Sequence, residues 1–294
     1  MYSKILVPLD GSAHSEGILP YVRSFARALT LPVELLHVND PTRLAPFSPP
    51  LQGGEYLQRV AASFTNAKEV KCTVELGDPA ARIVDLAAAQ ASALIAMTTH
   101  GYSGAQRWLL GSVADKVLHG ATNPLLLVRP AQGDGGGEAR LKTVLVPLDG
   151  SGLAEKVLPT VASLASRFAW EVVLAQVFVQ FQFAQPDAFL PSLGSNFPQQ
   201  REIWAQARAE ADRYLAAKVE GLQAQGLPNV SSLLIDGGAG GAAAEIIDLA
   251  RKTADNLVAM TTHGRSGMSR WILGSVTERV VRYSNDPVLV LRPQ

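Results

Sequence analysis

Short apolar runs recur at regular intervals along the chain and predict its strands. In the first half they fall at residues 4–8, 32–38, 70–76, 93–97 and 124–128. Helical stretches separate them, such as the one after Asp10 and the one carrying ARIVDLAAAQ. This alternation predicts parallel βαβ units with right-handed crossovers. The strands are continuously apolar, which indicates a sheet that helices cover on both faces.

The second half of the chain repeats the first. Residues 97–118 and 260–281 are identical at 14 of 22 aligned positions, and residues 4–26 and 143–165 at 13 of 23. Each later block consists of an apolar strand, a glycine-bearing loop and a Gly-Ser pair where a helix begins. Such a helix start presents unpaired backbone N–H groups to an anion. The sequence therefore predicts one α/β unit used twice.

The boundary between the copies is rich in glycine and small polar residues. We expect domains at 1–130 and 142–294, joined by a short flexible linker at 131–141. Pro124 and Pro287 open the last strand of each copy, where proline favours a sheet edge. The two edge strands can pair and form an internal pseudo-dimer. The alternatives are pairing with another chain and docking of the halves through helices.

The copies differ in length between the first and fourth strands. Asp10 and Asp149 are 139 positions apart, whereas Thr98 and Thr261 are 163 apart, so the second half carries 24 additional residues. They fall mainly within 180–222, which predicts a loop rich in Pro, Phe and Gln and a longer helix. Such a segment near strand ends can cover a site or mediate association, and its sequence does not decide between these roles.

Charge and cysteine content narrow the classes of function. The chain has 26 basic and 26 acidic residues, so it has no global positive field for nucleic acid or an anionic membrane. No apolar run approaches the roughly 20 residues of a membrane span. The single cysteine excludes an intrachain disulfide, and the sequence starts almost directly with a strand. We therefore expect a cytoplasmic protein.

An acidic turn follows the first strand of each copy. Asp10 and Asp149 lie at the carboxyl end of that strand, where open α/β sheets bind ligands. A carboxylate at this position can accept hydrogen bonds from two ribose hydroxyls. The alternative is structural, because Asp or the nearby Ser12 or Ser151 can cap the following helix.

Glycines and serines follow the fourth strand of each copy. They permit close backbone approach to phosphate, and they are Gly101, Gly111 and Ser112 in the first half and Gly264, Gly274 and Ser275 in the second. Each serine also has an acidic residue three positions later, Asp115 or Glu278, which is the spacing of a capping box. A ligand and a capped helix therefore both remain open.

Further side chains in these loops give weaker evidence for a ligand or a catalytic site. Arg265 supplies a guanidinium where the first copy has Tyr102, which favours the second half as the phosphate-binding copy. His100 and His263 have no companions at metal-ligand spacing. No GxxxxGK[ST] segment or nucleophile elbow is present, so the motifs give little support for catalysis.

The motifs PLDGS, THGxSG, LLGSV or ILGSV, and PLLLV or PVLVL occur in the same order in both halves. With them each half resembles a universal stress protein domain, and the chain resembles the tandem form of that family. The resemblance implies a doubly wound, five-stranded parallel sheet ordered 3-2-1-4-5 in each half. It places the acidic turn beside the glycine loop at a topological switch point.

The resemblance also implies an adenine-nucleotide site. The pattern G-x2-G-x9-G-[ST] of ATP-binding members matches both loops, except that Thr98 and Thr261 replace the first glycine. A threonine there narrows the ribose pocket or adds a hydroxyl contact. Asp10 and Asp149 would hold ribose, and the later glycines and serines would surround phosphates bridged by Mg²⁺ or Mn²⁺. Adenine would bond to main chain near Val38 and Val177.

The resemblance implies a noncatalytic stress-response module that binds ATP, ADP or AMP and associates as a homodimer or with an unidentified protein. The residues themselves leave two alternative functions open. One is a nucleotide-free interaction module that works through its dimer surfaces and the longer second-half segment. The other is a slow ATPase.

Overall fold

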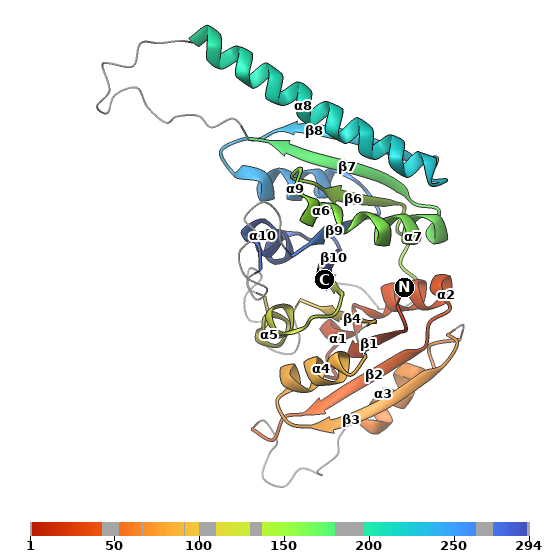
Figure 1. The fold of residues 1–294 in the computed structure, drawn as a ribbon. Coiled ribbons are helices and arrows are strands. Elements are labelled where there is room, and N and C mark those ends of the chain that lie inside the picture. The colour runs from red at the N-terminus through yellow and green to blue at the C-terminus, as the bar shows by residue number, and fades with distance from the viewer. Residues whose placement is uncertain are drawn as a thin grey trace.

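The computed structural model describes residues 2–42, 53–65, 67–90, 92–99, 110–129, 137–179, 197–262 and 273–292. Within these residues the chain forms one ten-stranded sheet with helices on both faces (Figure 1). The strand order is β3-β2-β1-β4-β5-β10-β9-β6-β7-β8. Each half therefore has the expected order 3-2-1-4-5, and the predicted doubly wound fold is confirmed.

The strands lie where the apolar runs predict them. Their bounds are β1 (Lys4–Pro8), β2 (Val33–Asn39), β3 (Val70–Leu76), β4 (Ala93–Thr98) and β5 (Leu125–Val128), and in the second half β6 (Thr143–Pro147), β7 (Glu171–Phe178), β8 (Val230–Asp236), β9 (Asn256–Thr261) and β10 (Val288–Leu291). The central strands β4 and β9 are buried at every position, which explains why their sequences are continuously apolar.

The helices divide between the two faces of the sheet. One face carries α1 (Ala13–Glu16), α2 (Leu19–Leu29), α3 (Gly54–Ala61), α6 (Gly152–Glu155), α7 (Leu158–Phe168) and α8 (Phe197–Ala224). The other carries α4 (Pro79–Ala88), α5 (Ser112–Gly120), α9 (Gly241–Lys252) and α10 (Ser275–Tyr283). Each face holds one apolar cluster that runs through both halves.

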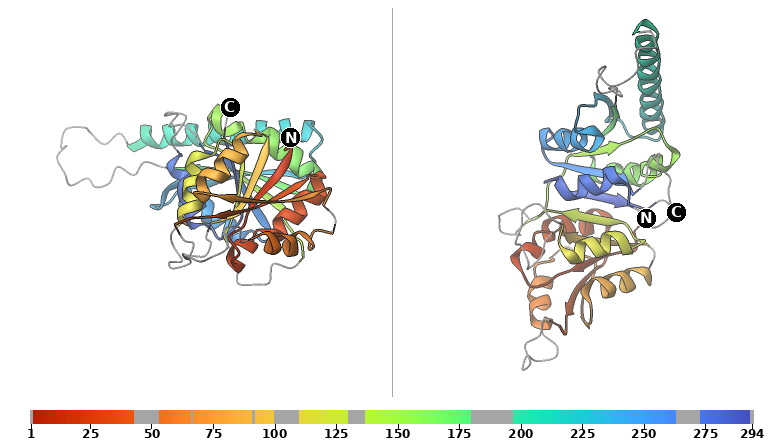
Figure 2. Two further views of the ribbon diagram at one scale, coloured as in Figure 1. Left: turned by 90° about the horizontal axis from the view of Figure 1, so that it is seen from below. Right: turned by 90° about the vertical axis from the view of Figure 1, so that its left-hand side faces the viewer.

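The two halves join through their last strands. β5 and β10 pair antiparallel, with Leu126 opposite Leu289, and Figure 2 shows the halves meeting along this line. The internal pseudo-dimer expected from the two edge strands is therefore confirmed. Arg282 of α10 crosses the junction, and its Nη2 donates to Asp115 Oδ1 of α5 at 2.7 Å.

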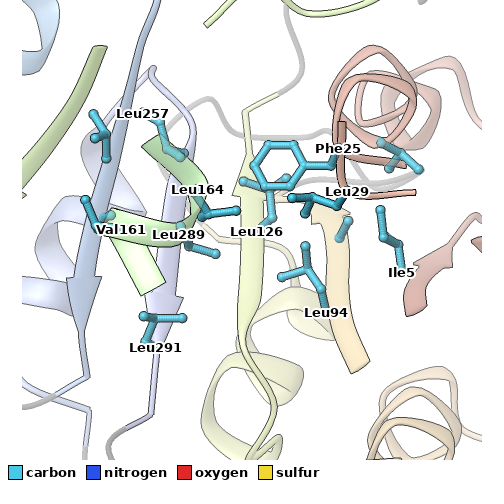
Figure 3. Close-up of a cluster of buried hydrophobic side chains, with 14 of the residues drawn as sticks. Ile5, Phe25, Leu29, Leu94, Leu126, Val161, Leu164, Leu257, Leu289 and Leu291 are labelled. Atoms are coloured by element: carbon cyan, nitrogen blue, oxygen red, sulfur yellow. The ribbon is translucent and has the colours of Figure 1, made fainter. Parts of the chain in front are cut away.

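Side chains from both halves pack together above this junction (Figure 3). Phe25 of α2 lies 5.0 Å, centroid to centroid, from Phe168 of α7, which stacks on Trp170 at 4.3 Å. The buried Leu126 and Leu289 belong to the same cluster. Because this apolar core is shared, we expect the halves to unfold together.

The main difference between the halves is the helix before the outer strand. α3 has 8 residues, whereas its counterpart α8 has 28 and runs along β7 and β8 (Figure 1). The longer second-half helix predicted from the additional residues is confirmed, while the loop predicted at 180–196 lies outside the described residues. In the described part of the chain, no helix combines the length and apolar character needed to cross a membrane.

Candidate functional site

The acidic turns after β1 and β6 have matching geometry. Asp10 Oδ1 accepts hydrogen bonds from Ser12 N at 3.0 Å and Ser12 Oγ at 2.6 Å, and Asp149 Oδ1 accepts one from Ser151 N at 2.9 Å. The serines are the helix caps, since Ser12 Oγ accepts from Ser15 N and Ser151 Oγ from Ala154 N. The capping role considered for this turn therefore belongs to serine. The aspartates accept hydrogen bonds from these serines and so stabilise the turns after the strands.

The helices α5 and α10 begin without a side-chain cap. Their N-cap residues are Gly111 and Gly274, and within the described residues no side-chain hydrogen bond caps either helix. Ser112 and Ser275 are therefore the first helical residues, and the capping box considered for them is wrong. The backbone N–H groups at these helix starts keep the positive end of the helix dipole available to an anion.

Short backbone bonds close the base of each glycine loop. Gly111 N donates to Thr99 O at 2.8 Å, and Gly274 N donates to Thr262 O at 2.6 Å. Thr98 and Thr261 are the last residues of β4 and β9, and both are buried. The predicted site residues Gly101, Gly264 and Arg265 lie between these anchors and outside the described residues.

The second half contains a cavity of about 710 Å³ at the carboxyl ends of its strands. Five predicted residues line it, which are Asp149, Val177, Thr261, Gly274 and Ser275. They come from the ends of three strands and the start of α10, so the fold brings together positions up to 126 residues apart in sequence. This volume is within the range of small-molecule sites.

The cavity also has a wall that the sequence analysis did not assign. Gln176 and Phe178 of β7 and Trp204, Glu210 and Tyr214 of α8 line it. Phe178 and Trp204 meet edge to face, with ring centroids 5.9 Å apart. The sequence signal for this wall was the longer second-half helix, because a segment near the strand ends can cover a site.

The first half places its predicted residues at matching positions, which are Asp10 after β1, Val38 in β2, Thr98 at the end of β4, and Gly111 and Ser112 at the start of α5. Next to α3, the first half is packed differently from the second-half cavity next to α8. His37 Nδ1 lies 2.8 Å from Leu9 O, and the ring meets Tyr56 edge to face with centroids 6.3 Å apart. A Cβ at Gly53, whose φ is +118°, would lie 2.3 Å from His37 Cδ2. This imidazole therefore fills the space beside the helix.

Tyr56 belongs to this tightly packed corner. Burial, followed by the charge of Glu16, raises the pKa of its hydroxyl well above the usual range. The phenol therefore stays neutral. Among the described residues no group of three His, Cys, Asp or Glu side chains is arranged to hold a metal ion.

Two parallel-sheet units with strand order 3-2-1-4-5, joined through their last strands, define a doubly wound α/β class of protein. The universal stress protein family model matches residues 1–129 and 140–292, and the chain belongs to this family. The family resemblance found in the sequence is thereby confirmed.

Relatives match either nearly the whole chain or about half of it. A universal stress protein of Mycolicibacterium smegmatis is 25% identical over 99% of this chain and 97% of its own length. One from Methanocaldococcus jannaschii is 29% identical over 51% of this chain and 94% of its own length, so it corresponds to a single half. The crystal structure of a universal stress protein from Archaeoglobus fulgidus covers 99% of this chain and 97% of its own, with a TM-score of 0.68 at 23% identity. The last comparison supports the fold.

Proposed function

We propose that this universal stress protein binds an adenine nucleotide, ATP, ADP or AMP, in the second-half cavity and acts as a noncatalytic stress-response module. One observation carries the proposal. The cavity combines the acidic turn at Asp149, the end of β9 at Thr261 and the uncapped start of α10 at Gly274 and Ser275. A nucleotide needs a polar acceptor for ribose hydroxyls and N–H donors for phosphate, and these residues offer both.

Each residue has a chemical role in this proposal. The Gly274 N–H is already bonded to Thr262 O, so the N–H groups of Ser275 and Val276 in the first turn of α10 face the phosphates. Asp149 accepts from ribose, and the backbone at Val177 bonds the base. Gly264 and Arg265 would complete the phosphate site. A divalent ion, Mg²⁺ or Mn²⁺, would be held through the phosphates and would neutralise part of their charge.

The first half provides a second set of residues for the same roles, which are Asp10, Val38, Thr98, Gly101, Gly111 and Ser112. We assign it the weaker affinity because His37 packs against the start of α3 where the second half opens its cavity. Bound nucleotide would regulate homodimerisation of the tandem chain or association with a partner protein in the cytoplasm. It can do so only if its affinity differs between the associated and free states.

Replacing Gly274 with leucine should weaken ATP binding at least tenfold. The φ of Gly274 is −64°, which any residue adopts, so the substitution places a side chain in the cavity without straining the backbone. Isothermal titration calorimetry with ATP and Mg²⁺ measures the effect. ATP should also raise the melting temperature of the unsubstituted protein, because a ligand that binds the folded state stabilises it.

The matched control is Gly111→Leu, at the same helix position of the first half with φ of −61°. It should leave the high-affinity binding intact. The proposal would be overturned if the unsubstituted chain showed neither heat nor thermal stabilisation with ATP, ADP or AMP. Equal losses in the two variants would contradict the assignment to the second half. Release of phosphate that exceeds background and falls in Asp149→Ala would instead support the ATPase alternative.

A further inference from the structure

The outer edge of the second half is a strand that is open on both faces. β8 ends the sheet (Figure 1), and Ser231, Ser232 and Leu233 in its middle are all exposed. Leu233 alone exposes 41% of its surface. Successive residues of a strand point to opposite faces, so within the described residues the helices leave the middle of this edge uncovered.

The backbone of β8 offers hydrogen bonds to a further strand. Asn229 O accepts from Val172 N of β7 at 2.8 Å, and Gly237 N donates to the end of β7 at 2.9 Å. The odd-numbered positions between them therefore bond β7, whereas Ser232 and Leu234 direct their N–H and C=O groups away from the sheet. Such groups are a template for the addition of another strand.

The side chains of β8 do nothing to prevent this addition. Residues 230–235 read VSSLLI and carry no charge, although charged side chains commonly protect edge strands. The opposite edge, β3, is protected. The strand registers place Thr73 where β8 has Leu233, and Lys71 and Glu75 lie two positions before and after Thr73 on the same face. The two halves therefore differ at their outer edges, and only β8 suits pairing.

A second copy of this chain fits the edge of β8. The chain already joins its two units by antiparallel pairing of the uncharged strands β5 and β10. Its 26 basic and 26 acidic residues balance, so two copies do not repel each other through net charge. A two-fold axis would set β8 against itself, so both copies use the same uncharged surface.

We propose that β8 is a homodimerisation surface, in which β8 strands of two copies pair antiparallel with the two-fold axis at Leu233. Ser232 of each copy then exchanges both backbone hydrogen bonds with Leu234 of the other. Leu233 lies opposite its own counterpart in a non-hydrogen-bonded pair, where side chains are closest. The pairing joins two ten-stranded sheets into one.

The β8 surface goes beyond the proposed nucleotide function and does not depend on it. A single strand pair with its flanking side chains makes a small interface, and small interfaces are typical of transient complexes. We therefore expect a dissociation constant of about 10 µM.

Disulfide cross-linking tests the register. In a Cys72→Ser background, which removes the single native cysteine, Leu233→Cys should form a covalent dimer under mild oxidation. Its Cα atoms would lie about 4.5 Å apart, within the span of a disulfide. Ser231→Cys is the register control, because Ser231 faces Ile235 of the second copy and should not cross-link to itself. Thr73→Cys, at the matching position of β3, should not cross-link either.

Sedimentation velocity measures the association without a cysteine. The unsubstituted chain should shift from monomer to dimer between about 1 and about 100 µM. Leu233→Lys places two like charges face to face and should raise the dissociation constant about tenfold or more. Thermal melting well below 10 µM, where both proteins are monomers, should give the same melting temperature and so show that the variant is folded.

The outcomes separate the β8 surface from the nucleotide site. A chain that stays monomeric up to about 100 µM, or a dimer that Leu233→Lys leaves intact, overturns the surface and leaves the nucleotide proposal standing. Cross-linking of Ser231→Cys as efficient as that of Leu233→Cys overturns the register. A dimer that forms through Leu233 in a chain without affinity for ATP, ADP or AMP supports the surface and overturns the proposed nucleotide function alone.

Discussion

Replacing Leu289 with aspartate should destabilise the entire chain by more than about 4 kcal/mol. Leu289 is fully buried on β10, opposite Leu126 of β5, in the antiparallel pair that joins the halves. A carboxylate at this position enters the apolar cluster that Phe25 and Leu164 share across the junction (Figure 3). Equilibrium unfolding in urea, followed by far-UV circular dichroism, measures the loss.

Leu233→Asp is the matched control. Leu233 lies on β8 at the outer edge of the sheet and is 41% exposed, so the same substitution should change stability by only about 0.5 kcal/mol. Because both apolar clusters run through the two halves, the unsubstituted chain should unfold in a single transition. A Leu289→Asp chain in which one half kept its original stability would show that the halves fold independently.

The sequence predicted the fold well because its signals are local and occur twice. Apolar runs between helical stretches identify buried parallel strands at either copy, and Pro124 and Pro287 mark where the last strands begin. The partner of those strands was less certain. Pairing with another chain satisfies the same edge, and only the register of Leu126 opposite Leu289 decides for the internal junction.

The site residues that follow strands could be predicted from the sequence. The site residues on α8, which lie opposite the strand ends, could not. Asp149 and Gly274 follow strands directly, so the topology brings them together. Trp204 is 26 residues beyond Phe178, and their contact depends on where α8 crosses β7. The capping box at Ser112 failed for a related reason. The helix begins one residue earlier than that motif requires, with Gly111 as its cap, and spacing alone does not fix such a boundary.

A charged cluster on the sheet distinguishes the first half from the second. Glu34 of β2 is 5% exposed, and its carboxylate accepts from Lys4 Nζ at 2.5 Å and Thr73 Oγ1 at 2.7 Å, with Lys71 Nζ at 3.0 Å. Burial acts to raise the pKa of Glu34, but the hydrogen bonds and charges of these partners outweigh it and lower the pKa to about 2. The carboxylate therefore stays ionised inside the sheet layer.

Glu34→Val should cost about 3 kcal/mol at pH 7, because it leaves Lys4 largely buried without its counter-charge. In the second half, uncharged residues occupy the same two positions. There the strand register places Thr143 and Val173 where the first half has Lys4 and Glu34. The double variant Lys4→Thr with Glu34→Val should consequently recover most of the loss, since apolar replacement of a whole buried pair is often neutral.

The same cluster predicts a pH dependence of unfolding. The pKa of Glu34 falls from 4.5 to about 2 on folding, so its contribution is fully present above pH 4.5 and is lost as the pH falls toward 2. The loss amounts to about 3 kcal/mol over that window. Urea unfolding of the unsubstituted chain and of the double variant, at several pH values between 5 and 2, should therefore give stability differences that shift by this amount in favour of the variant. Parallel curves for the two proteins would show that Glu34 titrates at the same pH in the folded and unfolded chain, and that its partners do not hold it ionised.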